Sequence, residues 1–496
     1  MLFNSMKFLI FFPVVVMVYF IIPNRAKNIW LLISSYFFYM CWNIKYVFLL
    51  ISSTLITYIS GILIEKTKKI REGARLELSC KKIILVLCIT LNLLILFYYK
   101  YFNFALDILE QLLKPFNIET EIPVFDIILP VGISFYTFQA LGYIIDVYNG
   151  KIYAEKNFLC YSLFVSFFPQ LVAGPIERSK NLLKQLQTPK SFNADMVKEG
   201  LLLMMWGYFL KLVIADRCAL LVNIVYGDYN SYYGLQLIIA NILFAFQIYC
   251  DFMGYSVIAK GAARVMGYKL MDNFLQPYMA QSVKEFWQRW HISLSSWFRD
   301  YVYIPLGGNR KTKIIKYRNI LITFLVSGLW HGANITFVFW GILHGFYQIF
   351  EEILMPFFQK FYKAIHINTL KIQWKVLRVI KTFILVDIAW IFFRADTFSS
   401  AVVILKNSFN FSGTKQILSN GLYQLEPNTL LQMLILVPSL IILLVYSIIK
   451  EKTGQYVMEW LLNKNIIVQF IIYWGAVMFI TFSLDITGQE FIYFQF

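Results

Sequence analysis

Two histidines in the middle of the chain have surroundings suited to proton transfer inside a membrane. His331 lies in residues 319–350, a stretch of 32 residues without Asp, Glu, Lys or Arg. If Asn319 marks one membrane interface, a helix rising about 1.5 Å per residue places His331 roughly 18 Å away, near the bilayer centre. Ionisable groups at such depth are costly and are candidates for function. The alternative is a histidine hydrogen-bonded inside a helix bundle.

His291 belongs to a different kind of segment, residues 282–308, in which aromatic and charged residues alternate. Its tryptophans and its charged residues are Trp287, Trp290, Trp297, Lys284, Glu285, Arg289, Arg299 and Asp300. A segment of this composition favours the membrane interface or the wall of a polar cavity. A plain interfacial helix with solvated charges explains Lys284 and Arg289 equally well, whereas for His291 we favour a functional role.

The chemistry that these residues favour is proton transfer during acyl transfer. A neutral imidazole can take a proton from a hydroxyl group and pass it on, which is worth about 10²–10⁴ in rate. Asn334, three residues after His331, would share its helix face and could orient a substrate carbonyl. We expect His344 and His366 to be structural or interfacial. The residues alone do not separate histidine-assisted acyl transfer from a proton-coupled transporter.

Other catalytic classes lack support in the sequence. There is no G-x-S-x-G elbow, P-loop or H-E-x-x-H, so serine hydrolase, nucleotide-binding and metalloprotease motifs are missing. The six cysteines are scattered without C-x-x-C spacing and without a nearby histidine at ligand spacing. We therefore expect no metal, no bound cofactor and no disulfide framework.

Composition places the chain in a membrane. Of its 496 residues 59% are hydrophobic, the mean hydropathy is +0.62, and uncharged runs recur along the whole length. The net charge of +17 comes from Lys and Arg in short stretches between apolar runs, such as residues 65–82. This is the pattern of the positive-inside rule, and it places such loops in the cytoplasm. We expect membrane lipids, and no nucleic acid, around the protein.

The apolar runs predict an all-α polytopic membrane protein, built as a single domain over residues 1–496 with about 10–12 membrane segments. Three regions make up the prediction: N-terminal helices in 1–126, a motif-bearing core in 127–350, and C-terminal helices in 351–496. Within the core, residues 282–308 are interfacial and residues 319–350 form the histidine helix.

Some segments should be irregular. Prolines and glycines in residues 127–145 predict a kinked or broken helix, and those near the end of residues 158–176 predict an interrupted or re-entrant segment. Residues 201–226 hold Lys211 and Asp216, whose spacing allows an ion pair or a helix break near Ala215.

Several motifs together resemble the membrane-bound O-acyltransferase (MBOAT) superfamily, in the AlgI-like branch of alginate O-acetylation proteins. They are DFMGYS at 251–256, EFWQRWHISLS at 285–295, WFRDY at 297–301, IPLGGNR at 304–310 and GLWHGA at 328–333, with LPVGISF at 129–135, AGPI at 173–176 and the closing FIYFQF at 491–496. The resemblance covers essentially the whole chain. The closing hexapeptide either contacts a partner or is a buried aromatic terminus.

The resemblance implies an MBOAT fold with a central tunnel and a catalytic histidine at His331, assisted by His291. Trp330 and Asn334 would shape the substrate site, and Arg299 and Asp300 would support its mouth. Family members move an acyl group, usually acetyl, from a cytoplasmic donor such as acetyl-CoA towards an extracytoplasmic polysaccharide. A separate extracytoplasmic acyltransferase often completes the transfer. The expected location is the cytoplasmic membrane.

Two alternatives stay open. D-alanyl transfer to teichoic acid, as by the DltB-like relatives, shares the Trp-His and Arg-Asp-Tyr motifs, but that branch tends to lack the Pro-Leu-Gly-Gly-Asn-Arg turn at 305–310. A proton-coupled transporter of an acyl donor or a glycan is the second alternative.

Overall fold

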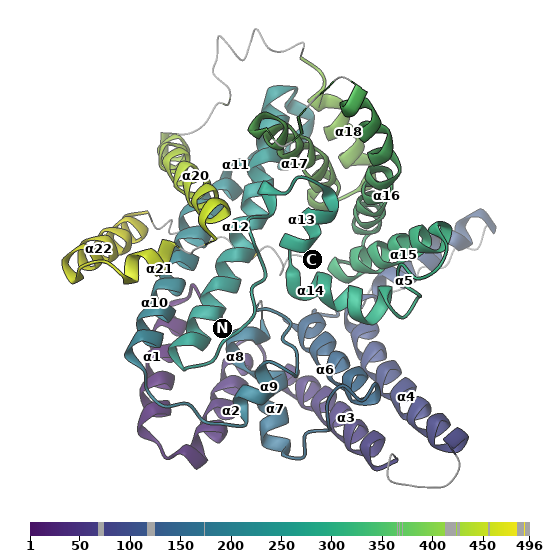
Figure 1. Ribbon diagram of the computed structural model, residues 1–496, viewed down its shortest axis with the longest axis vertical. Helices are drawn as coiled ribbons and strands as arrows, with labels where there is room; N and C mark the ends of the chain where they lie inside the picture. Colours follow the sequence, from purple (N-terminus) through teal and green to yellow (C-terminus); the bar gives the residue numbers. More distant parts are fainter. Residues whose placement is uncertain are drawn as a thin grey trace. The chain divides into compact units, whose positions relative to one another are not determined.

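The computed structural model describes residues 1–67, 74–116, 125–172, 174–364, 366, 368–369, 371–411, 423, 427–454, 457–483 and 491. All regular structure in these residues is helical, as the sequence predicted. Residues 68–73 of the predicted basic link, Ala173 of the AGPI motif and residues 492–496 of the closing hexapeptide lie outside the described residues. The chain divides into two compact units, one of residues 1–204 and 256–271 and one of residues 205–255 and 272–496 (Figure 1).

The first unit consists of the N-terminal helices and the segments that follow them. Its helices are α1 (Met6–Ile21), α2 (Asn24–Met40), α3 (Lys45–Thr67), α4 (Ala74–Lys100), α5 (Phe102–Leu113), the 3₁₀ turn Lys114–Phe116, α6 (Ile133–Tyr148), α7 (Phe158–Ser166), α8 (Phe168–Leu171), α9 (Leu182–Leu186) and most of α10 (Ala194–Tyr208). Helices α3, α4 and α6 pack against one another (Figure 1). Ser53 on α3 donates a hydrogen bond of 2.6 Å to Asn92 on α4, so even this apolar layer has paired polar groups.

Both irregular segments of this unit match their predictions. Helix α6 begins only at Ile133, after Pro130 and Gly132, so the run 127–145 is not one straight helix. Phe167 separates α7 from α8, and Pro169 lies in the first turn of α8, which explains the interruption in 158–176.

The second unit holds most of the motifs, whereas those at 129–135 and 173–176 lie in the first unit. Its helices are the π-helical turn Phe209–Ala215, α11 (Asp216–Gly227), the 3₁₀ turn Tyr229–Ser231, most of α12 (Leu235–Val265), the 3₁₀ turn Pro277–Met279, α13 (Val283–Arg289), α14 (Ile292–Phe298), the π-helical turn Arg299–Tyr303, α15 (Lys313–His331), α16 (Ile335–Ala364), α17 (Ile372–Arg394), α18 (Phe398–Ser408), α20 (Pro427–Thr453), α21 (Val457–Leu462) and α22 (Ile466–Phe482).

A buried charge cluster holds the first helices of this unit together. Lys211, on the π-helical turn, lies 2.8 Å from carboxylate oxygens of both Asp216 and Asp251. The predicted pair between Lys211 and Asp216 is confirmed, and Asp251 of the DFMGYS motif is a second partner. Three charges this deeply buried require such pairing, because an unpaired ion in the interior is strongly destabilising.

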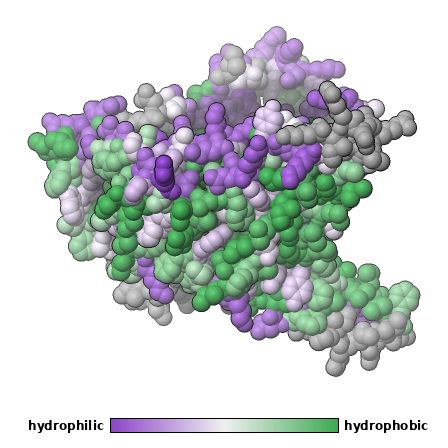
Figure 2. Space-filling view, turned by 90° about the horizontal axis from the view of Figure 1, so that it is seen from below, coloured by the Kyte–Doolittle hydropathy of each residue, from purple (hydrophilic) through white to green (hydrophobic). Residues whose placement is uncertain are grey.

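The outer surface suits a lipid environment. Among the described residues, four helical segments are long and apolar enough to cross a membrane: Lys45–Thr67, Ser79–Lys100, Leu235–Val265 and Gln432–Thr453. Apolar side chains cover much of the surface seen in Figure 2. The exposed apolar side chains include Phe470, Ile471 and Trp474 of α22. The protein is a multi-pass membrane protein, while the predicted number of 10–12 segments stays a prediction.

Candidate functional site

His291 lies at a sharp bend between two short helices. Ser282 caps α13 by accepting a hydrogen bond of 3.1 Å from the backbone N–H of Glu285, and the helix ends at Arg289. His291 then has a left-handed backbone with φ of +41°, which non-glycine residues rarely adopt. The backbone N–H of Ile292 donates to the carbonyl of Asn273 at 2.9 Å and so helps to hold the bend. Such strained conformations are concentrated at functional sites.

The His291 side chain is fully buried in an aromatic setting. Its ring lies edge-on to Phe252 of the DFMGYS motif, with 4.6 Å between the ring centroids. His291 belongs to a connection outside the spanning helices, and burial lowers its pKa to about 3. The imidazole is therefore neutral at pH 7 and can accept a hydrogen bond.

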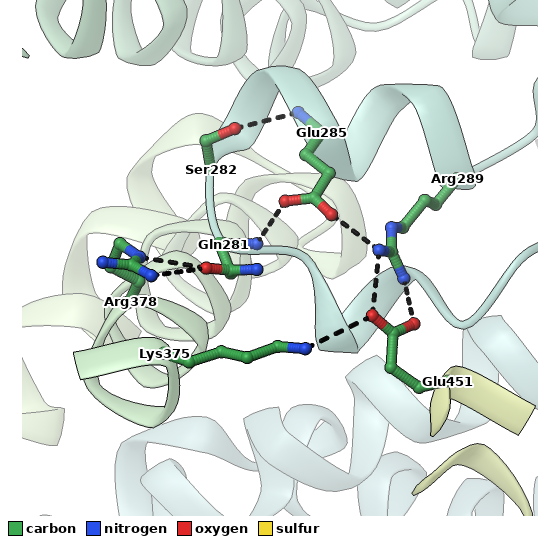
Figure 3. A network of polar contacts seen from close by, with 7 residues as sticks. All are labelled: Gln281, Ser282, Glu285, Arg289, Lys375, Arg378 and Glu451. Carbon is green, nitrogen blue, oxygen red and sulfur yellow. Dashed lines mark hydrogen bonds and ion pairs between the residues drawn. The ribbon is translucent and has the colours of Figure 1, made fainter. Parts of the chain in front are cut away.

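A polar network fixes α13 to two other helices (Figure 3). The Arg289 guanidinium binds Glu451 of α20 at 2.7 Å and Glu285 at 2.6 Å. The hydrogen bond to Glu451 raises the pKa of Arg289. Arg378 of α17 donates two hydrogen bonds, of 3.0 and 2.8 Å, to the Gln281 side-chain oxygen just before α13. Helix α13 is therefore anchored at both of its ends, and the charge of Arg289 is paired rather than solvated.

His331 lies at the end of a helix that packs closely against its neighbour. Thr312 caps α15, accepting a hydrogen bond from the backbone of Ile315, and His331 is the last residue of the helix. A Cβ atom at Gly341 of α16 would meet the carbonyl oxygen of Phe324 in α15. Glycine at this position therefore allows the two backbones to approach closely, as small residues do between membrane helices.

The structure corrects the prediction of one histidine helix over residues 319–350. The chain forms α15 and α16 instead, joined by residues 332–334. Asn334 is not on the helix face of His331 but before the first turn of α16, where its side-chain oxygen accepts from the N–H of Thr336 at 3.0 Å. Its amide donates to the carbonyl of Asp396 at 3.0 Å. Asn334 thus acts as an N-cap, and Gly-Ala-Asn-Ile-Thr is a recognisable helix-start signal.

Aromatic rings surround His331. The ring centroid of His331 lies 5.0 Å from Trp340 and 5.3 Å from Phe393, both nearly perpendicular to it. Trp330 is adjacent to both motif histidines, with its ring 5.0 Å from His331 and 5.7 Å from His291. The structure therefore places Trp330 in contact with both His331 and His291, while the catalytic roles of the two histidines stay predictions. Trp340 and Phe393 were not predicted, because single aromatics in apolar helices carry no distinguishing pattern.

The other two histidines differ from each other. His344 is fully buried and shares Trp340 with His331, since each imidazole centroid lies 5.0 Å from that indole. Neither ring nitrogen of His344 has a hydrogen-bond partner among the described residues. His366 lies in an exposed turn. On one continuous helix over residues 319–350, His344 would lie roughly 140° around the axis from His331. The break at residues 332–334 removes that constraint.

A cavity of about 920 Å³ lies between α13, α14, α15 and α16. Its apolar wall includes Trp287, Phe298, Ile320, Phe324 and Met355, and its polar lining includes Lys284, Arg299, Lys316, Glu351 and Glu352. Lys284 and Arg299 are exposed, whereas Ser327 is buried. Ser327 precedes His331 by four residues on α15, so this end of the cavity lies one helical turn, about 6 Å along the axis, from His331.

The two residues predicted to support the mouth form an ion pair. Arg299 lines the cavity and donates to Asp300 at 2.8 Å. Asp300 is not part of the lining among the described residues. Asn319, the expected interface marker, is buried and donates to the carbonyl oxygens of Leu306 at 3.2 Å and Gly308 at 3.3 Å. It thereby fixes the turn at 305–310 beside the cavity.

The amino-acid sequence of this chain is similar to those of known membrane-bound proteins. The family model for membrane-bound O-acyltransferases matches residues 153–385, which include both motif histidines and the cavity. A probable alginate O-acetylase AlgI from Pseudomonas syringae pv. tomato is 38% identical over 412 residues, or 83% of this chain and 76% of that protein. The chain belongs to the membrane-bound O-acyltransferase family.

Further relatives indicate the branch of this O-acyltransferase. A peptidoglycan O-acetyltransferase from Helicobacter pylori is 34% identical over 445 residues, covering 83% of this chain and 80% of that protein. A teichoic acid D-alanyltransferase from Bacillus subtilis is 31% identical over 245 residues, covering 46% and 62%. The similarity to the O-acetylating relatives extends over far more of the chain, which places the O-acyltransferase in the AlgI-like branch.

For an O-acyltransferase, the geometry offers a histidine beside a substrate-sized cavity. His331 is buried in a layer of aromatic side chains, where electrostatic interactions are stronger than in water. The cavity combines an apolar wall with charged groups at its exposed end, which is the usual character of a small-molecule site.

Proposed function

We propose that this O-acyltransferase transfers an acetyl group from a cytoplasmic thioester, with acetyl-CoA as the donor, for the O-acetylation of a cell-envelope or secreted polysaccharide. The observation that carries the proposal is the cavity whose buried end lies one helical turn from His331. The O-acetylating relatives named above support acetyl as the group transferred, and their printed names support a glycan as the final acceptor.

The charge distribution supports a cytoplasmic opening of the cavity. Arg310, Lys311 and Lys313 flank the start of α15, and Lys360 and Lys363 lie near the end of α16. The ion pair between Lys316 and Glu352 joins the start of α15 to the second half of α16, so both groups of basic residues lie towards the same end of this helix pair. Basic residues gathered at one end indicate the cytoplasmic side, and hence a cytoplasmic membrane.

Basic groups at the exposed end of the cavity suit a donor with phosphate groups. Arg299 pairs with Asp300, and Lys316 pairs with Glu352. Lys284 has no ion-pair partner within the part of the chain that the structure describes. Its ammonium group would attract the phosphates of coenzyme A, while the apolar wall would receive the pantetheine arm.

The reaction at His331 follows from its position. The oxygen of an acceptor hydroxyl attacks the thioester carbonyl carbon, so a C–O bond forms and the C–S bond breaks. His331 takes the hydroxyl proton and passes it to the leaving thiolate, which departs as a thiol. His291 assists the proton transfer, Trp330 and Asn334 hold the local structure, and Arg299 with Asp300 supports the cavity mouth.

The acceptor hydroxyl belongs to the polysaccharide or to an extracytoplasmic acyltransferase partner that completes the transfer. Labelled acetyl-CoA supplied to membrane vesicles of either orientation, with that partner present, tests the proposal. Label should reach the partner or the glycan only when the cytoplasmic face is exposed to the donor. Transfer of D-alanine from a carrier protein instead, or proton-coupled uptake that needs no acceptor, would replace the proposal with one of its two alternatives.

A further inference from the structure

A pair of aromatic rings forms part of the cavity wall on its buried side. Trp287 of α13 and Phe324 of α15 both line it, and their ring centroids lie 5.2 Å apart at a steep angle. Trp287 is 7% exposed. An edge-to-face pair of this kind is a favourable contact and forms a firm wall. The inner end of the cavity is therefore closed by side chains rather than by backbone.

Directly behind this wall lies the aromatic layer around His331. The Trp287 ring centroid is 5.6 Å from Trp340, and Trp340 is 5.0 Å from His331. Trp287 also lies edge-on to His344, at 5.1 Å. Among the described residues, the cavity lining includes Trp287 but neither Trp340 nor His331. On this side of the cavity, the Trp287 indole thus lies between the cavity and the Trp340 ring that contacts His331.

The cavity as a whole does not limit the size of an acyl group, because about 920 Å³ is at the upper end of the range for small-molecule sites. Any limit must come from the inner end, where the reacting carbonyl has to approach His331. The carbons beyond that carbonyl then meet Trp287 and the rings behind it. A pocket wall discriminates about 10–200-fold for one methylene group.

We propose that Trp287 sets the upper length of the acyl group that this enzyme transfers, by closing the inner end of the cavity against the ring layer around His331. The inference rests on the proposed function, since it takes the cavity as the donor site. Replacing the indole with a smaller apolar side chain opens space on the His331 side of the wall without removing a charge or a hydrogen bond between described residues.

Competition between labelled acetyl-CoA and butyryl-CoA tests this inference on the full-length protein in membranes with its acceptor system. Trp287→Leu should raise the ratio of butyryl to acetyl kcat/KM at least 10-fold, and Trp287→Phe should raise it by a smaller factor. Trp297→Leu is the matched control. Trp297 is similarly buried and packs on Phe298 and Tyr301, but it is not part of the cavity lining among the described residues.

Each outcome decides the matter. A butyryl-to-acetyl ratio that rises in both Trp287 variants, and not in Trp297→Leu, supports the inference. An unchanged butyryl-to-acetyl ratio in a Trp287 variant that still transfers acetyl overturns the inference about Trp287 and leaves the proposed function in place. Because Trp287→Phe is the milder change, this variant provides the test if Trp287→Leu does not fold. A folded wild type that transfers no acyl group from either thioester overturns the proposed function and this inference with it.

Discussion

The anchoring of α13 by Arg289 gives the sharpest prediction about stability. Arg289 bridges Glu285 and Glu451, and the three side chains are 20%, 26% and 21% exposed. Arg289→Gln keeps most of the side-chain volume and removes the charge. Two carboxylates are then left close together without their shared cation, which favours detachment of α13 from α20.

The expected loss in the free energy of unfolding on Arg289→Gln lies between two limits. Exposed ion pairs contribute about 0–1 kcal/mol, and removing one partner of a fully buried pair costs about 3–5 kcal/mol. Groups that are about one-fifth exposed fall between these limits, so we expect Arg289→Gln to cost about 2 kcal/mol. Lys375 is the matched control, because it lies 3.8 Å from Glu451 and is 41% exposed. Lys375→Gln should cost less than about 0.5 kcal/mol.

Thermal unfolding of the purified protein in detergent measures both effects. A double-mutant cycle with Glu451→Gln should give a coupling of about 1–2 kcal/mol, because the two side chains contact each other directly. The coupling should shrink at high salt, where the Debye length is about 3 Å. The reasoning is refuted if Arg289→Gln destabilises no more than Lys375→Gln, or if the effects of Arg289→Gln and Glu451→Gln simply add.

Two further predictions concern packing and pH. Gly341→Ala should destabilise by about 1–3 kcal/mol, because its Cβ would meet the Phe324 carbonyl oxygen, whereas Gly475→Ala in α22 has open space and should be neutral or stabilising by up to about 1 kcal/mol. Equal unfolding temperatures for the two variants would contradict the close packing of α15 and α16. Because burial lowers the pKa of His291 to about 3, below the value near 6.5 of the unfolded chain, protonation favours unfolding as the pH falls below about 6.5. Between pH 6.5 and 5 this histidine should account for about 1.6 kcal/mol of lost stability, and a His291→Gln variant with the same pH slope as wild type would show the attribution to be wrong.

Much of the architecture follows from sequence patterns because its determinants are local. Prolines and glycines indicated the broken segments near Gly132 and Phe167. The charge spacing in 201–226 indicated the pair between Lys211 and Asp216. Each of these signals lies within a few residues of the feature that it specifies.

The features that the sequence did not indicate are contacts between residues far apart in the chain. Asp251 pairs with Lys211, and Arg289 pairs with Glu451, across 40 and 162 positions of the chain. Trp340 joins the site because α16 folds back along α15 after the break at residues 332–334. The absence of charge in 319–350 concealed that break, since hydropathy does not distinguish one long helix from two helices with a short connection. The signal that could have revealed it was Asn334 as a helix cap.

The structure describes one residue of the closing aromatic motif at 491–496, which was predicted either to contact a partner or to be buried. Phe491 is fully buried, with its ring 4.2 Å from Tyr255 and 6.2 Å from Phe252, the residue that also packs on His291. Of the two readings of this motif, the buried aromatic terminus therefore holds for Phe491. Contact of the hexapeptide with a partner stays a prediction.

The central claim is that His331 performs the proton transfer of an acetyl transfer. The direct measurement is the rate of label transfer from acetyl-CoA in membranes containing wild type, His331→Ala or His366→Asn, with the extracytoplasmic partner present. His366 is an exposed turn residue with φ of +52°, a conformation that Asn tolerates, so its variant controls for loss of a histidine. The account predicts that His331→Ala inserts normally and loses at least about 10²-fold in rate, while His366→Asn keeps the wild-type rate. Acetyl transfer by His331→Ala at the wild-type rate would contradict it.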